Sequence, residues 1–344
     1  DVKIENNFFS HCKLFIPLIL SNDTIIMKPP YDITPKILQL LTLVSELLGE
    51  VNANYLSKPS PQLRKQNKIK TIHSSLQIEG NTLTEEQITA IIENKRVLGP
   101  KKDVLEVVNA IKVYDLLQDF DASSEKSFLK AHQLLMNDLI EKSGKYRTKG
   151  VGIVKGKKVE HLAPPFENVP FLMKDLFQYL KMKDELTLIK SCVFHYEMEF
   201  IHTFIDGNGR MGRLWQTVIL MQQYPVFEFL PFETLISKTQ KEYYKALATS
   251  DKSGKSTVFI EYMLNVIHQS LFEILNYKSK IFKESDRLEY FSKSGKKEFS
   301  RKDYMSTFKD ISSATASRDL KKGIELKLWK RSGDKSSTVY RVLK

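Results

Sequence analysis

Apolar residues recur at helical spacing along most of the chain, and this pattern predicts a mainly α-helical protein. The first long helix is expected to begin at Thr34 and Pro35, an N-cap and first-turn pair, and to reach about Leu56. Residues 1–33 mix β-branched and aromatic residues with Asn, Pro and Asp, and we expect an extended arm or short strands there. The remaining helices are predicted at 63–78, 84–92, 103–117, 124–140, 169–181, 186–204, 210–223, 241–247 and 257–275.

One segment departs from the helical pattern and predicts a β-hairpin. Residues 151–161 contain two short β-rich runs around a Lys-Gly turn, and Pro164 and Pro165 end the segment. An ordinary solvent-exposed hairpin and a hairpin that belongs to a functional site both fit these residues.

Charge sets the C-terminal fifth of the chain apart. The net charge is +12, and the segment from Tyr277 onward carries 19 Lys and Arg against 9 Asp and Glu, so the preceding residues carry only +2. Within this segment we predict helices at 300–308 and 312–322, and strands at 328–331 and 338–342. This order, with a basic surface, resembles a winged helix-turn-helix, which places its second helix in the DNA major groove. Protein contacts or dimerisation are the alternative use of such a unit.

Length and composition indicate a soluble globular protein of two or three domains. The longest apolar runs, such as Leu14–Leu20, are too short to span a bilayer, so no membrane contact is expected. The only cysteines are Cys12 and Cys192, which is no disulfide framework, and the first residues lack a signal-peptide pattern. We therefore expect a cytoplasmic protein.

The residues with the clearest chemistry lie at 202–213, between two predicted helices: His-Thr-Phe-Ile-Asp-Gly-Asn-Gly-Arg-Met-Gly-Arg. The loop amides and the start of the second helix would direct free N–H groups at one spot, which is a phosphate-binding arrangement. Arg210 and Arg213 add forked donors for phosphate oxygens. Asp206 offers the hard oxygen that Mg²⁺ prefers, and His202 has the natural pKa of a general base near neutral pH. These residues suggest transfer of a nucleotide phosphate to a hydroxyl.

The motif His-x-Phe-x-(Asp/Glu)-Gly-Asn-Gly-Arg-x-x-Arg is the signature of the Fic family, and residues 202–213 match it at every specified position. The resemblance implies a Fic-fold helical bundle with a β-hairpin flap. It also implies Mg²⁺-dependent transfer of AMP from ATP to a Ser, Thr or Tyr hydroxyl of a target protein, and of the protein itself. Transfer of UMP or GMP is an alternative, and so is a DNA-binding regulator whose Fic core senses a nucleotide.

Each signature residue receives a role in such a reaction, which depends mainly on positioning and charge neutralisation. By resemblance, His202 removes the proton of the target hydroxyl, and Asp206 holds Mg²⁺ on the α- and β-phosphates. Phe204 is expected to face inward. The phosphate-binding groups are the amides of Gly207, Asn208 and Gly209, the Asn208 side chain, and the guanidinium groups of Arg210 and Arg213, which hold the outer phosphates.

A second motif lies at the end of the predicted 63–78 helix. Read alone, Ser75-Leu-Gln-Ile-Glu79-Gly80 is a helix end followed by a glycine C-cap. Beside the signature, it is similar to the inhibitory motif (Ser/Thr)-x-x-x-Glu-(Gly/Asn) of Fic proteins. The resemblance implies that Glu79 pairs with Arg213 and takes the place of a phosphate oxygen, and that Ser75 helps to hold this pair.

The resemblance also assigns two further parts of the site. The flap residues are Val151, Gly152, Ile153 and Val154. An exposed strand edge there could pair with an extended target segment through main-chain hydrogen bonds. Tyr243 and Tyr244 resemble the nucleobase-side helix of Fic enzymes. Because neighbouring residues point in different directions on a helix, at most one tyrosine can line the nucleotide pocket while the other serves the core.

Three more polar residues fall within predicted helices. His132 lies on the same face as apolar neighbours, and we expect a packed or capping histidine rather than a ligand. His195 and Glu199 share a helical face with His202 but lack the His-Glu-x-x-His order of zincins. We expect them to pack and to orient the signature helix.

These observations divide the chain into three predicted parts. Residues 1–94 form an N-terminal region with the inhibitory helix, residues 95–276 form the Fic catalytic core, and residues 277–344 form the winged helix-turn-helix. The expected partner is a target protein with a modifiable hydroxyl. DNA contact through the last part and a homodimer stay open.

Overall fold

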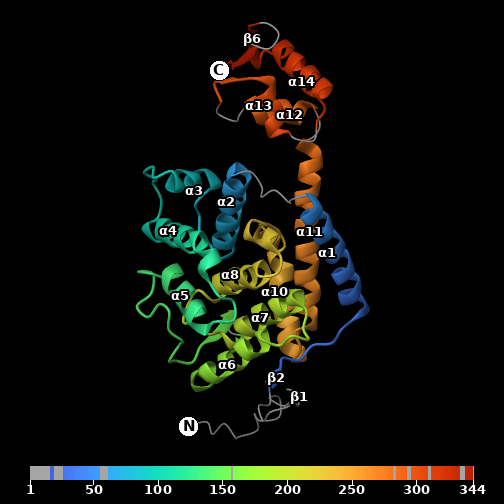
Figure 1. Ribbon diagram of the computed structural model, residues 1–344. Helices are drawn as coiled ribbons and strands as arrows, with labels where there is room; N and C mark the ends of the chain where they lie inside the picture. Colours follow the sequence, from blue (N-terminus) through green and yellow to red (C-terminus); the bar gives the residue numbers. More distant parts are fainter. Residues whose placement is uncertain are drawn as a thin grey trace, which may run out of the picture. The chain divides into compact units, whose positions relative to one another are not determined.

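The computed structural model describes residues 16–18, 26–54, 61–155, 158–281, 284–292, 296–308, 311–333 and 338–343. The chain divides into two compact units, Asp1–Leu271 and Phe272–Lys344. Helices are the main element of both units (Figure 1), so the mainly α prediction is confirmed. None of the helices in the described residues is both long and apolar enough to cross a membrane. The three-part division at residues 94 and 276 stays a prediction.

The first unit is built from helices α1 to α11 and short 3₁₀ turns. The helices are α1 (Pro35–Asn54), α2 (Pro61–Ile78), α3 (Glu85–Ile92), α4 (Lys101–Asp115), α5 (Glu125–Leu135), α6 (Val169–Leu180), α7 (Thr187–Ile201), α8 (Asn208–Met221), α9 (Glu233–Lys238), α10 (Gln240–Ser253) and α11 (Thr257–Ile281). The 3₁₀ turns are η1 (Leu117–Asp119), η2 (Phe166–Asn168) and η3 (Pro225–Glu228). α11 continues past Leu271 into the second unit.

Side-chain caps start two of these helices where the sequence predicts them. At the start of α1, the Thr34 hydroxyl accepts a hydrogen bond from the Ile37 amide at 3.1 Å. At the start of α3, Thr84 and Gln87 form a reciprocal capping box. These caps satisfy amides that have no partner within the helix, so local sequence was sufficient to locate both helix starts.

Helices α7 and α8 pack together in the first unit, and Figure 1 shows α2 and α5 near α8. The fully buried Phe128 ring lies 5.4 Å from the ring of Phe204 and 5.1 Å from that of Trp215. Phe204 thus faces inward, as predicted. Gly212 allows α8 to approach α7 closely, because a Cβ at this position would lie 2.6 Å from the His195 ring. This packing fixes the helices on both sides of the signature loop.

Several helix boundaries differ from the sequence prediction: α7 ends at Ile201, before the predicted 204, α10 reaches Ser253, beyond the predicted 247, and α9 was not predicted. The ends of α5 and α11 also differ. α5 ends at Leu135, and Met136 packs so closely against Gly207 that a Cβ on this glycine would lie 2.8 Å from its sulfur. The chain leaves the helix in this region, and Asp138 takes a positive φ of 57°. α11 instead continues to Ile281, because residues 257–281 contain no glycine or proline to stop it.

Two pairs of short strands accompany the helices of the first unit. β1 (Ile16–Leu18) pairs antiparallel with β2 (Ile26–Lys28), and most of the predicted N-terminal arm, Cys12 included, lies outside the described residues. β3 (Gly152–Lys155) pairs antiparallel with β4 (Lys158–Leu162). The predicted hairpin is therefore confirmed.

The second unit combines helices with a three-stranded antiparallel sheet of order β5-β7-β6. Its elements are α12 (Glu284–Ser292), β5 (Glu298–Phe299), α13 (Arg301–Thr307), α14 (Ser313–Glu325), β6 (Trp329–Ser332) and β7 (Val339–Val342). The two predicted helices and two predicted strands correspond to α13, α14, β6 and β7. The sequence predicted neither α12 nor β5. The winged-helix class stays a prediction.

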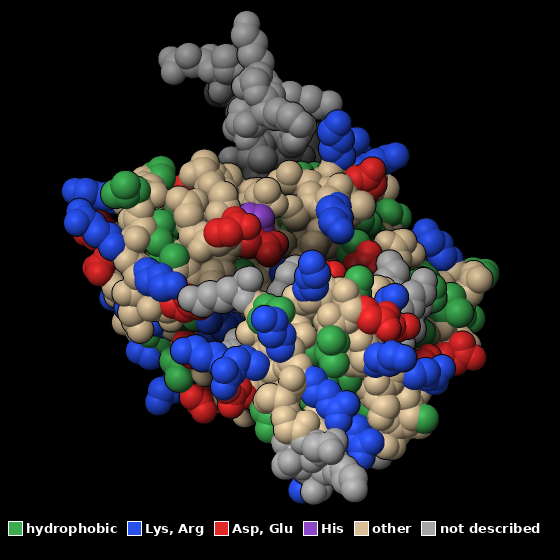
Figure 2. Space-filling model, turned by 90° about the horizontal axis from the view of Figure 1, so that it is seen from above, with side chains coloured by type: hydrophobic (Ala, Val, Ile, Leu, Met, Phe, Trp, Pro, Cys, Tyr) green, Lys and Arg blue, Asp and Glu red, His purple; other side chains and the backbone are tan. Residues whose placement is uncertain are grey.

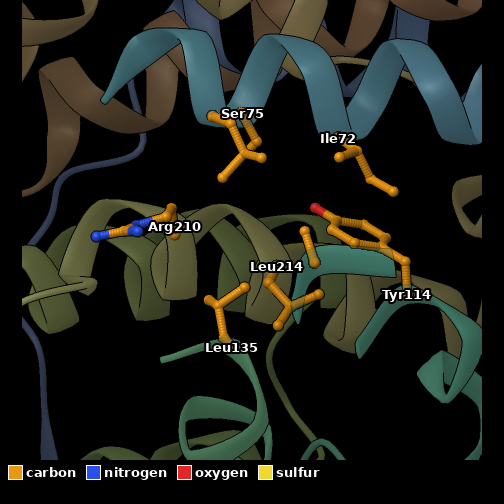
Figure 3. Close-up of a pocket in the computed structure, with 8 residues that line it drawn as sticks. Ile72, Ser75, Tyr114, Leu135, Arg210 and Leu214 are labelled. Atoms are coloured by element: carbon orange, nitrogen blue, oxygen red, sulfur yellow. The ribbon is translucent and has the colours of Figure 1, made fainter. Parts of the chain in front are cut away.

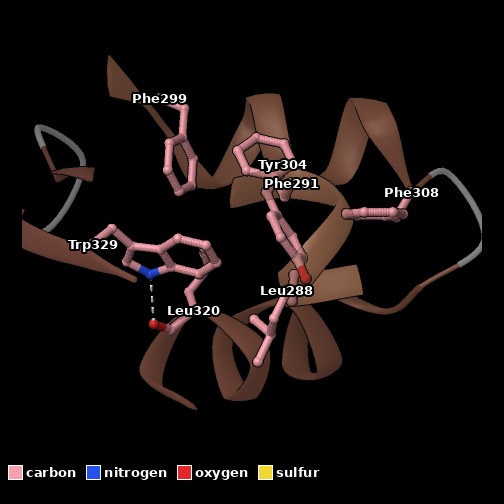
Figure 4. Close-up of a cluster of buried hydrophobic side chains, with 8 residues drawn as sticks. Leu288, Phe291, Phe299, Tyr304, Phe308, Leu320 and Trp329 are labelled. Atoms are coloured by element: carbon pink, nitrogen blue, oxygen red, sulfur yellow. Dashed lines mark hydrogen bonds between the residues drawn. The ribbon is translucent and has the colours of Figure 1, made fainter. Parts of the chain in front are cut away.

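An aromatic core holds the second unit together, and Figure 4 shows its members converging from α12, α13, α14 and the sheet. The Trp329 ring meets that of Phe299 edge-on at 5.2 Å, and its indole N–H donates to the Leu320 carbonyl at 3.0 Å. Beneath this core, Arg287 of α12 forms a buried ion pair with Asp319 of α14 at 2.6 Å. α12 is therefore part of the folded second unit.

Candidate active site

His202 directly follows α7 and is held in an uncommon backbone conformation. Its φ and ψ are 52° and 61°, in the left-handed region, and its amide donates to the Met198 carbonyl at 3.0 Å. This conformation ends α7 and lets the chain enter the signature loop. The His202 side chain is half-buried. The candidate base is therefore fixed at a helix end.

The loop that follows is closed by its own hydrogen bonds. The Asn208 side chain accepts from the Phe204 amide at 2.8 Å and donates to the Phe204 carbonyl at 2.9 Å. Gly207 takes a φ of 88° just before α8. Because the Asn208 side chain is buried and used within the loop, the cradle role that we predicted for this residue is limited to its main-chain amide. The first-turn amides of α8 have no acceptor within the helix and can bind an anion.

Asp206 presents a carboxylate at the edge of this loop, with 47% of its side chain exposed. One oxygen, Oδ1, accepts from the Gly207 amide at 2.5 Å and from Arg210 Nη2 at 2.8 Å. Within the described part of the chain, no group of three or more His, Cys, Asp or Glu residues could hold a metal ion. A single accessible carboxylate suits Mg²⁺, which usually keeps several waters and shares its other ligands with substrate phosphates. The residues present therefore fit the predicted ion.

His132 holds the main chain of Asp206 through a hydrogen bond. Its Nδ1 accepts from the Gly144 amide at 2.8 Å, so the ring proton lies on Nε2, which donates to the Asp206 carbonyl at 3.0 Å. The ring stacks on Phe204 with 3.5 Å between centroids. Burial lowers the pKa of His132 to about 4, so the imidazole is neutral near pH 7. His132 is packed, as predicted from sequence.

Arg210 is held by two acids. Nη1 lies 3.1 Å from Glu106 Oε1 of α4, Nη2 lies 2.8 Å from Asp206 Oδ1, and Arg210 is only 4% exposed. Glu106 also accepts from the Asn81 side chain at 2.8 Å. Arg210 therefore links Asp206 to α4, and Asn81 connects this network to the residues that follow α2.

Arg213 is fully buried and contacts the end of α2. Its Nη2 lies 2.8 Å from Glu79 Oε1, Nε donates to the Ser75 hydroxyl at 3.1 Å, and Nη2 donates to the Ser75 carbonyl at 2.9 Å. A Cβ built on Gly209 would lie 2.5 Å from Glu79 Oε1. The Glu79 carboxylate thus stands beside the glycine of the first turn of α8, where an anion would bind.

The two tyrosines of α10 have different surroundings. Tyr243 is 1% exposed, and its hydroxyl lies 3.0 Å from His195 Nε2. His195 Nδ1 lies 2.7 Å from Gln216 Oε1, so this histidine connects α7, α8 and α10 through buried hydrogen bonds. Tyr244 is 49% exposed. Only Tyr244 reaches solvent, and it is the tyrosine that keeps the candidate nucleobase-side role.

The hairpin of β3 and β4 supplies the candidate flap, which Val151 precedes. Gly152 pairs with Leu162 and Ile153 with His161, and a bulge between Ile153 and Val154 shifts the register. A bulge bends and twists a strand and often occurs near functional sites. β3 and β4 form a two-stranded sheet. That an edge of this sheet pairs with a target segment stays a prediction.

A small cavity lies between α2 and α8 (Figure 3). It measures about 10 Å³, close to the least that can hold a water molecule. In Figure 3 the Arg210 guanidinium points away from the cavity, whereas the Tyr114 hydroxyl points toward α2. The cavity is too small for a nucleotide and lies behind the signature residues.

The sequence did not predict the residues outside the signature that hold it in position. Glu106 holds Arg210 and accepts a hydrogen bond from Asn81, and Arg147 donates to main-chain carbonyls around His202. Glu106 is a charged residue on the buried face of the amphipathic helix α4. A charge on the apolar face of a predicted helix is the signal that could have identified it. Arg147 lies outside the helices and strands, and no local pattern distinguishes it from a solvent-exposed arginine.

Helix α7, the closed glycine loop and the start of α8 form a helix–loop–helix whose first-turn amides can bind an anion. His202 lies at the start of this loop, and this arrangement defines the class of protein. The model of the Fic/DOC family matches residues 122–220, which include all of these elements. A crystal structure of a Fic family protein from Desulfovibrio desulfuricans is 40% identical, covers 92% of this chain and 98% of its own chain, and superposes with a TM-score of 0.72. The chain belongs to the Fic family.

Curated relatives match a shorter part of the chain. The protein adenylyltransferase Fic of Nematostella vectensis is 28% identical over 55% of this chain, and the protein adenylyltransferase fic-1 of Caenorhabditis elegans is 26% identical over 65% of it. The matched regions cover 47% and 44% of those two relatives. A solved structure of C. elegans Fic-1 is 23% identical, with a TM-score of 0.59, and shows the shared fold.

Proposed function

We propose that this protein is a protein adenylyltransferase that transfers AMP from ATP, with Mg²⁺, to a Ser, Thr or Tyr hydroxyl of a target protein, and that Glu79 holds it inactive. The observation that carries the proposal is the contact of Glu79 with Arg213 beside Gly209. A carboxylate is bound there as a phosphate oxygen would be bound at a helix N-terminus. The names of the two curated relatives support the same activity.

The proposed reaction uses groups that lie on both sides of the signature loop. The target hydroxyl gives its proton to His202, its oxygen bonds to the α-phosphorus of ATP, and pyrophosphate leaves. The main-chain amides of the loop and of the first turn of α8 bind the α- and β-phosphates, and Arg213 binds the γ-phosphate. Asp206 would hold Mg²⁺, which neutralises phosphate charge. The protein therefore contributes a base, an anion-binding helix start and one carboxylate.

Inhibition follows from competition for one arginine. While Glu79 occupies Arg213, the γ-phosphate cannot use this guanidinium, and bound ATP places its α-phosphorus away from the line of attack. Displacement of about 1 Å can cost roughly 10²-fold in rate, so inhibition does not require exclusion of ATP. Ser75 remains bound to Arg213 when Glu79 leaves, which keeps the guanidinium in position for the nucleotide.

The experiment that tests this proposal compares two labelled nucleotides. The Glu79→Gly protein is incubated with Mg²⁺ and either α-labelled or γ-labelled ATP, and covalent label is measured on the protein and on candidate targets. Transfer of the α-label alone is expected, and His202→Ala in the same background should abolish it. Transfer of the γ-label would indicate a kinase and contradict the proposal. Competition with unlabelled UTP and GTP tests the alternative nucleotides.

The exposed face of α14 favours a second function for the C-terminal unit, binding to DNA. Arg318, Lys321 and Lys322 are exposed on this helix, whereas Ala316 and Leu320 are buried in the core. Basic side chains on one helix face give salt-dependent affinity for nucleic acid. Figure 2, which views the molecule of Figure 1 from above, shows basic side chains interspersed with acidic ones. Loss of DNA affinity on charge reversal at Lys321 and Lys322 would support this function, and salt-independent binding would contradict it.

A further inference from the structure

Arg147 is a buried cation whose described side-chain acceptors are all main-chain carbonyls. It is 2% exposed. Nε donates to the His202 carbonyl at 2.7 Å, and Nη2 donates to the Ile201 carbonyl at 3.2 Å. Nη1 donates to the Lys149 carbonyl at 3.0 Å, and Nη2 also donates to the Pro164 carbonyl at 2.5 Å. One guanidinium thus joins three separate segments of the chain.

The three segments are the end of α7 and both sides of the hairpin base. Ile201 ends α7, and His202 is the candidate base. Lys149 precedes β3, and Pro164 follows β4. The carbonyls at a helix C-terminus lack partners within the helix and carry partial negative charge, so a buried cation is favourable there. The planar fork of arginine can reach carbonyls in several directions at once, which the ammonium of lysine cannot do.

The segment that contains Arg147 contacts the signature loop at further points. The Arg147 amide donates to the Thr203 carbonyl at 3.1 Å. Gly144 reaches the Asp206 carbonyl through His132. These bonds lie on both sides of Phe204. The residues between α5 and the hairpin therefore hold the loop from outside, and Arg147 is the member of this segment that also binds the hairpin base.

We propose that Arg147 is a positioning residue that fixes the hairpin relative to His202, so that a target segment paired with the hairpin presents its hydroxyl to the base. This role rests on the proposed transferase function. Arg147 touches no reacting atom and acts through the main chain on either side. Its loss should therefore impair alignment of the target, while nucleotide binding at the start of α8 stays intact.

The test uses Arg147→Lys in the full chain that also carries Glu79→Gly. The substitution keeps the charge but removes the fork. We expect kcat for transfer to fall about 10²-fold, KM for the target to rise, and the Kd of ATP to stay unchanged. Arg287→Lys is the matched control, because Arg287 is a buried, ion-paired arginine of the second unit. Arg287→Lys should lower the free energy of unfolding without changing kcat, KM for the target or the Kd of ATP.

Hydrogen exchange provides a readout that does not depend on activity. In Arg147→Lys, the amides of β3 and β4 should exchange faster, whereas those of α8 should keep their protection. If Arg147→Lys fails to fold, hydrogen exchange is measured on the Glu79→Gly protein instead. A hairpin that Arg147 links to His202 should open together with the end of α7, so the hairpin amides and the His202 amide should report the same free energy of opening. Unchanged kcat and hairpin protection in Arg147→Lys, or independent opening of the hairpin and His202, would overturn the proposal. If Glu79→Gly transfers no nucleotide, the proposed function fails, and exchange still tests the link between hairpin and helix.

Discussion

Glu79→Gly is the perturbation that separates inhibition from catalysis most directly. Glu79 is the residue after α2, and its carboxylate contacts Arg213 Nη2 at 2.8 Å. Removal of the side chain leaves Arg213 with two acceptors, the hydroxyl and the carbonyl of Ser75. It also clears the space beside Gly209, where the carboxylate oxygen lies. The substitution therefore frees an anion site without removing any residue that we assign to catalysis.

The structure sets the size of two opposing effects. Arg213 is fully buried, whereas the Glu79 side chain is 28% exposed. A buried charged donor that loses a partner costs about 1–3 kcal/mol, which lowers Tm by roughly 2–4 °C per kcal/mol in a domain of about 150–250 residues. Correct placement of the γ-phosphate should raise the transfer rate about 10²-fold. The variant should thus be less stable and more active.

The assay measures both effects on the same proteins. Transfer of α-labelled AMP gives the rate, and thermal unfolding with and without an unreactive ATP analogue gives the stability. At about 100 times Kd a ligand adds about 2.7 kcal/mol. At one fixed analogue concentration, the analogue should stabilise Glu79→Gly more than it stabilises the parent, because Arg213 is free to bind the γ-phosphate. Glu93→Gly is the matched control, since Glu93 caps the end of α3 and pairs with Lys65 and Lys95 at the surface.

Stability and activity together show whether the ion pair inhibits. If Glu79→Gly loses stability as expected but transfers AMP no faster than the parent and than Glu93→Gly, the ion pair is structural and does not inhibit. Arg213→Ala tests the other end of the pair. It should reduce activity by itself, and the addition of Glu79→Gly should not restore it, because the γ-phosphate then lacks its arginine in both proteins.

Further outcomes test the base, the buried acids and the unit boundary. His202→Ala should lower transfer about 10²–10⁴-fold while the Kd of ATP, measured by calorimetry, stays the same. Desolvation raises the pKa of Glu233 from 4.5 to about 8. Desolvation raises the pKa of Glu197 to about 8 as well. Each acid should therefore lower the free energy of unfolding as pH rises from 4.5 to 8, by up to about 1.4 kcal/mol per pH unit. Denaturant titrations should show this slope reduced, but not removed, in Glu233→Gln. A chain that ends at Ile281, where α11 ends, should keep its thermal unfolding transition and its transfer activity, and an unfolded product would contradict the two-unit division.

Local sequence was sufficient for the parts of the site that depend on neighbouring residues. The order His202, Asp206, Gly207 and Arg210 determines a helix end, a tight turn and a helix start within a few residues, and each of these has a recognisable signal. Glu79 and Arg213 are 134 positions apart, and only the resemblance of two motifs predicted their contact. The motif carries long-range information that periodicity does not contain.

The parts that sequence reasoning missed are polar groups with distant partners. Glu106 and Arg210 are 104 positions apart, and Arg147 contacts carbonyls as far away as His202. A main-chain carbonyl is present at every residue, so nothing in the sequence shows which carbonyls a buried arginine will bind. The end of α5 was missed for a similar reason: Met136 leaves the helix to pack on Gly207, a tertiary contact that overrides helix propensity.

The two signature arginines differ in what removal of Glu79 can change. Glu79 is one of the partners of Arg213, and its departure opens a position for a phosphate oxygen. Arg210 is held by Glu106 and Asp206, which belong to α4 and to the signature loop, so the loss of Glu79 leaves both of its ion pairs in place. Activation should therefore change the γ-phosphate site while the support of Asp206 stays the same. We therefore expect a single carboxylate at the end of α2 to regulate the proposed transfer, because its loss leaves the ion pairs of Arg210 with Glu106 and Asp206 in place.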